Sequence, residues 1–346
     1  MTEIFLTIFF ISVLLFFLGS GVWVAISMIG VSTIGMILFT SRPVGDAMAT
    51  TIWGTSSSWT LTALPLFVWM GEILFRTRLS ENLFAGLSPW MQKLPGGLIH
   101  VNVVGCALFA AISGSSAATV ATVGKMSIPE LRKRKYPERI LLGSLAGSGT
   151  LGLLIPPSII LIIYGVTVQE SIAKLFIAGI LPGIMIALIF MSYVIIWSLI
   201  NKKSMPKYVE SFSFLEKIKK SKQLLPVIIL ISAVIGSIYT GVATATEAAS
   251  LGVVGALILS YFQGSLTVES FKLSLLGATK TSCMIAFILA GSTFLSLAMG
   301  FTGLPRNLAL WIQNMELSPY VLIFVLMIFY IILGMFLDGI SAVVLT

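Results

Sequence analysis

The chain has 346 residues, of which 57% are hydrophobic and only 10% charged, and its mean hydropathy is +1.05. This composition excludes a soluble globular protein, because apolar segments of about 20 residues recur along the chain as transmembrane helices do. The net charge of +8 could indicate a nucleic-acid partner, but the basic residues cluster in loops between apolar segments. We therefore expect an all-α polytopic membrane protein whose surroundings are the lipid bilayer, with no nucleic acid bound.

The apolar segments form two groups on either side of a polar basic loop at 201–222. In chain order, the first group predicts spans at 3–18, 22–39 and 57–75, a paired segment at 97–112 and 115–128, and spans at 140–164 and 174–199. The second group predicts spans at 224–240, 247–262 and 281–300 and a last segment from residue 320. The first span is not read as a secretory signal, because it lacks a basic leading region and a small-residue cleavage site.

The basic residues indicate how these segments are oriented. We place Met1 outside the cell and let residues 97–128 enter the membrane halfway and return. Then all but three of the 21 lysines and arginines face the cytoplasm, the three being Arg42, Lys174 and Arg306. A full crossing at 97–128 would reverse this asymmetry from Lys125 onward. The charge pattern thus predicts a re-entrant helical hairpin.

The tip of this hairpin is unusually polar for a segment at bilayer depth. Ser113, Gly114, Ser115 and Ser116 follow one another, and non-helical backbone is tolerated in hydrocarbon only where it is buried in protein or lines a polar cavity. The glycine suits a sharp turn, while the hydroxyls and uncommitted carbonyls suit a hard cation such as sodium. The helix that begins near Ser115 points its positive end at the same place, which suits a carboxylate. Alternatively, these small residues only let membrane helices pack closely.

A second break follows in the stretch GSGTLGLLIPPSIILIIYG at 147–165. Pro156 and Pro157 cannot donate to the carbonyls of Gly152 and Leu153, four residues earlier, so the helix should break there. We expect the hairpin tip and this broken helix to face each other and to form half of an ion and substrate site.

The two halves of the chain also show the pattern of an internal repeat. Three predicted spans and an arm precede Gly114, and three predicted spans precede Gly339 in the stretch GMFLDGISAVVLT. Because the first copy would start outside and the second inside, the copies would be inverted, as in many secondary transporters. The predicted first repeat is 1–200, the cytoplasmic loop 201–222 and the incomplete second repeat 223–346. Within the first repeat we assign scaffold spans 1–76, an arm 77–96, the hairpin 97–128, the broken helix 140–164 and a span 174–199.

Six motifs in this order resemble the large membrane (M) subunit of tripartite ATP-independent periplasmic (TRAP) transporters, the DctM-like family. They are GCALFAAISGSSAATVATVG, IPELRKRKYP, GTLGLLIPPSIILIIYGV, FIAGILPG, GVATATEAASLGVVGAL and GMFLDGISAVVLT. The resemblance implies a sodium-driven elevator-type transporter, not an enzyme, that imports organic acids across the bacterial inner membrane. It also implies a small membrane (Q) subunit, a periplasmic substrate-binding protein and no cofactor beyond Na⁺ as the coupling ion.

The resemblance also implies particular site residues. A first sodium ion would be bound by Ser113, Gly114, Ser115 and the backbone at Gly152, Ile155 and Pro157. A second sodium or substrate region would include Asp338, Gly339 and Ser341, and substrate would meet Ser116 and Thr119. Family members continue past the second hairpin into a second broken helix. We therefore expect a C-terminal truncation here, and transport only from a form longer by about 80 residues.

Other polar residues receive simpler interpretations. Glu72 lies one helical turn before Arg76 and should form an ion pair with it. Glu247 follows Thr244 at a helix start, where capping explains it, whereas Asp338 at a predicted hairpin tip is a functional candidate. His100, the only histidine, should be a polar residue at the membrane boundary.

Three other functions stay open from the sequence. An intramembrane serine hydrolase would need a base near the hairpin serines, and the only nearby candidate is His100, more than two helical turns away. A channel would use the same polar backbone as an open pore, and an ion-coupled carboxylate carrier would work without a binding protein.

Overall fold

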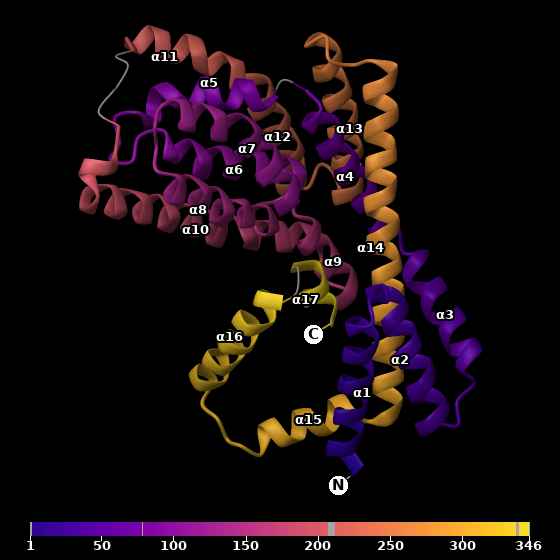
Figure 1. Ribbon diagram of the computed structural model, residues 1–346. Helices are drawn as coiled ribbons and strands as arrows, with labels where there is room; N and C mark the ends of the chain where they lie inside the picture. Colours follow the sequence, from indigo (N-terminus) through magenta and orange to yellow (C-terminus); the bar gives the residue numbers. More distant parts are fainter. Residues whose placement is uncertain (1, 78, 207–211, 337–338, 346) are drawn as a thin grey trace. The chain divides into compact units, whose positions relative to one another are not determined.

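The computed structural model describes residues 2–77, 79–206, 212–336 and 339–345, and every regular element within these ranges is a helix (Figure 1). Four helical stretches are long and apolar enough to cross a membrane, at 172–200, 214–239, 245–262 and 268–302. A fifth span results if the helices at 44–56 and 59–75, which are bent by 55° relative to each other, count as one. The predicted all-α membrane fold is thereby confirmed.

The chain folds into two compact units, which we describe separately. The first comprises residues 1–61 and 283–346, and the second comprises residues 62–282. Helix α14 (Val268–Thr302) contributes to both units. These units cut across the two repeats expected from the sequence, so the repeat boundaries remain a prediction.

The first unit is built from helices near the two ends of the chain. They are α1 (Thr2–Gly19), α2 (Val24–Phe39), α3 (Val44–Ser56), the later part of α14, α15 (Leu304–Gln313), α16 (Pro319–Phe336) and α17 (Gly339–Leu345). Its core joins α2 to α14, where Met36, Phe294 and Ala298 are fully buried together. A short 3₁₀ helix at Trp59–Thr62 leads out of this unit.

The second unit contains most of the regular structure. Its α-helices are α4 (Ala63–Phe75), α5 (Leu79–Met91), α6 (Ile99–Ser113), α7 (Ser116–Lys133), α8 (Glu138–Gly149), α9 (Ile159–Val168), α10 (Ile172–Ile200), α11 (Phe214–Ser221), α12 (Leu225–Tyr239), α13 (Ala245–Phe262) and the start of α14. Short 3₁₀ helices are η2 (Thr150–Leu153), η3 (Lys202–Ser204) and η4 (Lys222–Leu224). In Figure 1, α11, α5, the α6–α7 pair, α8 and α10 follow one another as layers.

The α6–α7 pair lies in the middle of these layers and forms the predicted helical hairpin. It packs against α5 on one side and α8 on the other, and α6 also contacts α4 and α10. Twelve of the fifteen residues of α6 are buried, including the polar Asn102. An α-helix of 15 residues is only about 22 Å long, which is shorter than a bilayer core of about 30 Å and suits a half crossing.

Several element boundaries differ from the prediction. The span expected at 57–75 is preceded by a separate helix α3, which the apolar pattern missed because it contains Asp46 and several threonines. Helix α14 begins at Val268 rather than near residue 281. The apolar pattern missed its first turns because they carry Lys272 and Lys280. The polar loop 201–222 includes the helix α11, and α15 was not predicted. A hydropathy pattern finds the apolar part of a helix, but not the polar turns that extend it.

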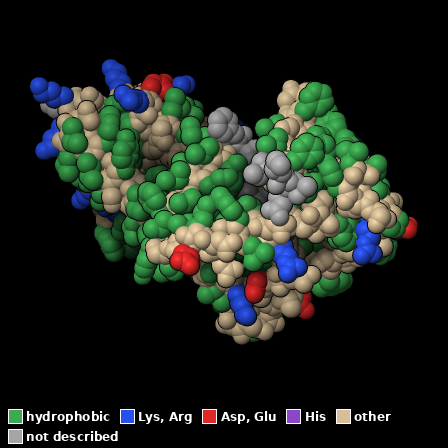
Figure 2. Space-filling model, turned by 90° about the horizontal axis from the view of Figure 1, so that it is seen from below, with side chains coloured by type: hydrophobic (Ala, Val, Ile, Leu, Met, Phe, Trp, Pro, Cys, Tyr) green, Lys and Arg blue, Asp and Glu red, His purple; other side chains and the backbone are tan. Residues whose placement is uncertain are grey.

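Hydrophobic side chains cover much of the molecular surface, as expected for contact with lipid. On the face in Figure 2 they form broad areas, and the few charged side chains gather in groups. One of the exposed large hydrophobic side chains is Leu181 on α10, which is 77% exposed.

Helices α12 to α17 repeat the order seen from α1 to α7. Two spans (α12 and α13) precede a long helix (α14, 35 residues), a short helix (α15, 10 residues) and a helix that leads into α17. In the first copy the bent pair α3–α4 takes the place of α14, and α5 takes that of α15. An internal repeat would produce such an order, and the repeat itself stays a prediction.

Candidate functional site: a hairpin tip against a broken helix

The hairpin turns within two residues, Gly114 and Ser115. Helix α6 ends at Ser113, and Gly114 follows in the left-handed region with φ = +57°. Its N–H donates to the carbonyl of Ala110 at 3.0 Å, which caps the last turn of α6. Residues with a Cβ atom are strained at this φ, so glycine is favoured at the tip.

Three oxygen atoms lie together just inside the tip. The hydroxyl oxygens of Ser113 and Thr119 are 3.0 Å apart, and the carbonyl oxygen of Ser115 is 3.3 Å from the first and 2.7 Å from the second. Both side chains are buried, with Thr119 fully inaccessible and Ser113 6% exposed. We call these three atoms the oxygen triangle.

Ser115 contributes to this triangle through its backbone, not its side chain. Its own hydroxyl oxygen accepts a long hydrogen bond from the N–H of Ala118 at 3.5 Å and caps the start of α7. Ser116 is half-buried in the first turn of α7. Thr119, which the sequence assigned to substrate, lies beside Ser113, which the sequence assigned to sodium.

The twin prolines interrupt the helix as predicted. Helix α8 ends at Gly149, η2 follows, and α9 begins only at Ile159, with the buried prolines 156 and 157 between them. The carbonyl of Leu153, which the second proline leaves without a backbone donor, accepts a hydrogen bond from the hydroxyl of Ser158. Within the described part of the chain, no hydrogen-bond donor reaches the carbonyls of Gly152, Ile155 and Pro157.

The structure brings the hairpin tip and the broken helix into direct contact. The N–H of Ile159 donates to the carbonyl of Gly114 at 3.4 Å. A Cβ atom at Gly114 would lie 2.8 Å from the carbonyl oxygen of Pro157, and one at Gly152 would lie 2.9 Å from the carbonyl carbon of Ser115. Each glycine thus lets one backbone approach the other, which larger residues would prevent.

The second predicted region is described only in part. Asp338 lies outside the described residues. Gly339 and Ser341 stand in α17, which belongs to the first unit, and Ser341 is buried. In the described ranges no three histidine, cysteine, aspartate or glutamate side chains gather as they would around a transition metal. Oxygen atoms of hydroxyls and carbonyls are therefore the ligands that the described site offers.

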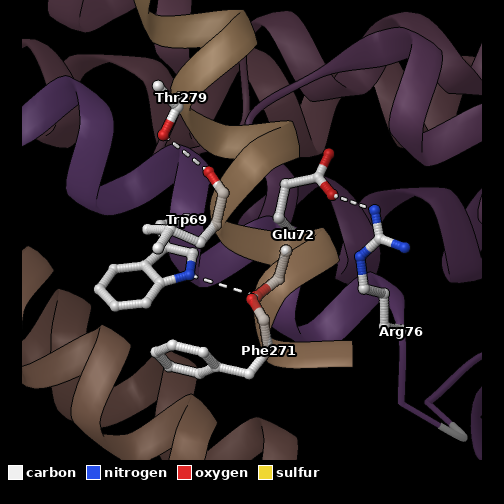
Figure 3. A network of polar contacts seen from close by, with 7 residues as sticks. Trp69, Glu72, Arg76, Phe271 and Thr279 are labelled. Carbon is white, nitrogen blue, oxygen red and sulfur yellow. Dashed lines mark hydrogen bonds and ion pairs between the residues drawn. The ribbon is translucent and has the colours of Figure 1, made fainter. Parts of the chain in front are cut away.

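The ion pair expected on α4 is present. A guanidinium nitrogen of Arg76 lies 3.1 Å from the carboxylate of Glu72, and both side chains are about one quarter exposed (Figure 3). One turn earlier, the indole of Trp69 donates to the hydroxyl of Ser274 at 3.3 Å and stacks edge-on against Phe271 (Figure 3). This network joins α4 to the start of α14 and leaves Glu72 a structural role.

Two further assignments can be compared with the structure. Thr244 and Glu247 form a reciprocal capping box at the start of α13, as predicted. His100 is fully buried near the start of α6, with Nε2 2.8 Å from the carbonyl oxygen of Pro95, and its position at the membrane boundary stays a prediction. It precedes Ser113 by 13 residues of α6, about 20 Å, which removes the only candidate base for a hydrolase.

Comparisons with known proteins show what this architecture belongs to. Residues 10–346 match the family model "Tripartite ATP-independent periplasmic transporter, DctM component". The chain is 32% identical over 318 residues to the C4-dicarboxylate TRAP transporter large permease protein DctM of Pseudomonas aeruginosa, covering 92% of this chain and 74% of that protein. It is 31% identical over 331 residues to the sialic acid TRAP transporter large permease protein SiaM of Vibrio cholerae, covering 95% and 76%.

A third relative is the isethionate TRAP transporter permease protein DctMQ of Oleidesulfovibrio alaskensis, which is 30% identical over 333 residues, covering 95% of this chain and 52% of that protein. These relatives are permease proteins rather than enzymes, which sets the serine hydrolase aside. With its apolar helices, its hairpin and its broken helix, the chain is an inner-membrane transport protein and belongs to the DctM family of TRAP transporter large permeases.

Proposed function

We propose that this chain is the large permease subunit of a sodium-driven secondary transporter that imports organic acids. A periplasmic binding protein would deliver the acid, and a separate small membrane subunit would complete the permease. The relatives named for C4-dicarboxylates, sialic acid and isethionate support an organic acid as the substrate class. The chain matches about half of the DctMQ protein, which supports a second subunit for the remainder.

The oxygen triangle is the observation that carries the sodium assignment. A hard cation with octahedral oxygen ligands at about 2.4 Å has neighbouring ligands about 3.4 Å apart. The three edges of the triangle, 3.3, 3.0 and 2.7 Å, are slightly shorter, as expected when hydrogen bonds hold the atoms in place of an ion. A cation here would replace those bonds with a small outward shift of each oxygen.

The broken helix can supply the remaining ligands. The carbonyls of Gly152, Ile155 and Pro157 lie on the segment that touches the hairpin tip, and they receive no donor within the described residues. Unsatisfied carbonyls are costly inside a membrane protein, and a cation would satisfy them. Three tip oxygens and two or three carbonyls make the roughly six ligands that a hard cation favours.

The start of α7 is our candidate for the substrate acid. The helix begins at Ser116 beside the same tip, and its positive end together with the half-buried Ser116 hydroxyl favours an anionic group. Cation and acid would then bind within one turn of helix of each other. Their attraction would couple the two binding events.

Sodium binding can be measured directly on the purified chain. We expect Na⁺, but not K⁺ at equal ionic strength, to raise its melting temperature in detergent. Ser113→Ala and Thr119→Val each remove one ligand and should raise the half-saturating Na⁺ concentration about tenfold. Thr122→Val is the matched control, because Thr122 is buried one turn further along α7 and its hydroxyl has no hydrogen-bond partner among the described residues.

Equal half-saturating Na⁺ concentrations in all three variants would mean that Ser113 and Thr119 serve only in helix packing.

The substrate class needs a separate measurement, since the binding protein selects the acid. The acid that most raises the melting temperature of the purified cognate binding protein identifies it, and stabilisation by neutral compounds alone would contradict an organic acid. The prediction of sodium binding to the chain and the prediction of acid binding to the binding protein are tested separately, so either can be wrong without the other.

A further inference from the structure

A large cavity lies at the end of the hairpin opposite its tip. It has a volume of about 960 Å³ and is bounded by the residues that precede α6, those that end α7 and those that follow α10. Its lining residues with ionisable side chains besides Tyr136 are Lys93, Glu130, Lys133, Arg134 and Lys135. Four cations thus face one cavity that contains a single carboxylate.

The carboxylate does not neutralise this charge. Glu130 pairs with Arg134 at 3.6 Å, while the neighbouring Arg132 is held outside the cavity by Glu138 at 2.6 Å. Lys93, Lys133 and Lys135 have no acidic partner within the described residues. Three unpaired positive charges around one concave surface favour an anion there.

The uncharged wall of the cavity adds hydrogen-bonding groups. The hydroxyl of Tyr136 accepts a hydrogen bond from the N–H of Leu98 at 3.1 Å, which leaves its own proton available to a ligand. Burial raises the pKa of Tyr136, so the phenol stays protonated at neutral pH. Helix α6 starts beside it and adds its positive end.

A separate apolar groove lies next to this cavity, between α8 and α10. It has a volume of about 290 Å³ and is lined almost entirely by apolar side chains and Gly143. Val194 lines this groove and packs in one cluster with Tyr136 and Met205 of the basic cavity. A Cβ at Gly96 of the cavity would lie 2.6 Å from Cγ1 of Val194, so the two spaces share a wall.

We propose that this cavity and groove bind one anionic phospholipid. The phosphate lies among Lys93, Lys133 and Lys135, and an acyl chain follows the groove between α8 and α10. Val194 is six residues before the end of α10, a rise of about 9 Å, which suits the distance from a phosphate to the first methylenes of a chain. The positive-inside rule explains basic residues in a loop, but not their position around a cavity that adjoins an apolar groove.

Such a lipid would join three parts of the second unit that are far apart in sequence. The residues before α6 and after α7 are the two ends of the hairpin, and Met205 follows α10. The bound lipid would hold these ends together while the tip carries the oxygen triangle. This inference is independent of the sodium assignment.

Binding can be measured on the delipidated full chain in a neutral detergent by native mass spectrometry. We expect tighter binding of phosphatidylglycerol than of phosphatidylcholine. Each lysine near a phosphate contributes about fivefold, so Lys133→Gln with Lys135→Gln should weaken phosphatidylglycerol binding about thirtyfold. Lys272→Gln with Lys280→Gln removes the same charge from exposed positions on α14 and should leave binding unchanged.

A second variant separates a lipid from a soluble phosphate. Gly143 lines the groove, and a Cβ there meets nothing within 4 Å, so Gly143→Leu fills the groove without a clash. It should weaken phosphatidylglycerol but leave glycerol phosphate unaffected. Gly236→Leu on α12, which is also free of neighbours, is the control.

Three results would overturn the proposal. Equal affinity for the two lipids would show that the anionic headgroup is not recognised. Equal losses of affinity in the two lysine double variants would show that the lipid does not bind at this cavity. Unchanged lipid binding in Gly143→Leu, together with displacement of the lipid by inorganic phosphate, would show a site for soluble anions only.

Discussion

Among the residues of the hairpin tip, neighbours of the same type have different roles. Ser113 and Thr119 place hydroxyl oxygens in the oxygen triangle, while Ser115 places its carbonyl there and uses its hydroxyl as a helix cap. The sequence grouped the serines because their hydroxyls look alike. On this geometry Ser115→Ala should lower thermal stability through the lost cap, by about 1 kcal/mol or less, and change sodium affinity less than Ser113→Ala.

The contact between Gly152 and Ser115 gives a prediction about stability. Gly152→Ala would place a methyl group 2.9 Å from backbone atoms that cannot rotate away, and should destabilise the chain by about 1–3 kcal/mol. Gly143→Ala, in the open groove on α8, should be neutral or stabilising by up to about 1 kcal/mol. Melting temperatures in detergent measure both, and equal values would mean that the tip and the broken helix do not touch.

Among the elements, the hairpin and the loops determine the topology. Helices α6 and α7 are joined by two residues and packed on each other, so the chain returns to the side from which it came. Short α6 and the buried position of the pair supply the protein walls that a half crossing requires. The basic residues after α7 and around α11 should then face the cytoplasm.

Thiol labelling in intact cells tests this topology. With Cys283 replaced by serine and Cys106 buried, Lys135→Cys and Lys219→Cys should resist a membrane-impermeant reagent. Val242→Cys follows one more span, is 82% exposed in the wild type, and should react. All three should react after the membrane is permeabilised. Labelling at position 135 from outside would mean that residues 97–128 cross fully.

For the whole molecule, the family assignment predicts an assembly. The chain spans about half of the DctMQ relative, and about three quarters of the separate large permeases from Pseudomonas aeruginosa and Vibrio cholerae. We expect it to copurify with a small membrane subunit. Coexpression with a tagged small subunit, followed by size-exclusion chromatography, should give one joint peak, whereas an unrelated tagged membrane protein should not retain the chain. Separate peaks in both cases would contradict a two-subunit permease.

Much of this molecule could be predicted from residue order. The all-helical membrane class follows from apolar length, the hairpin tip from the run of serines around Gly114, and the helix break from Pro156 and Pro157. The Glu72–Arg76 pair and the Thr244–Glu247 box are local, with partners three or four residues apart. Local steric and hydrogen-bonding rules reach that far along a chain, and so the sequence by itself determined these features.

The tertiary structure decided what depends on residues distant in sequence. No local rule states that the carbonyl of Ser115 shares a triangle with two hydroxyls, or that the His100 ring is buried against the carbonyl of Pro95. The basic cavity joins residues of two helix ends to Met205, about 70 residues later, because α10 packs alongside the hairpin. Such sites arise from packing between helices, whose side-chain complementarity is a property of the folded chain.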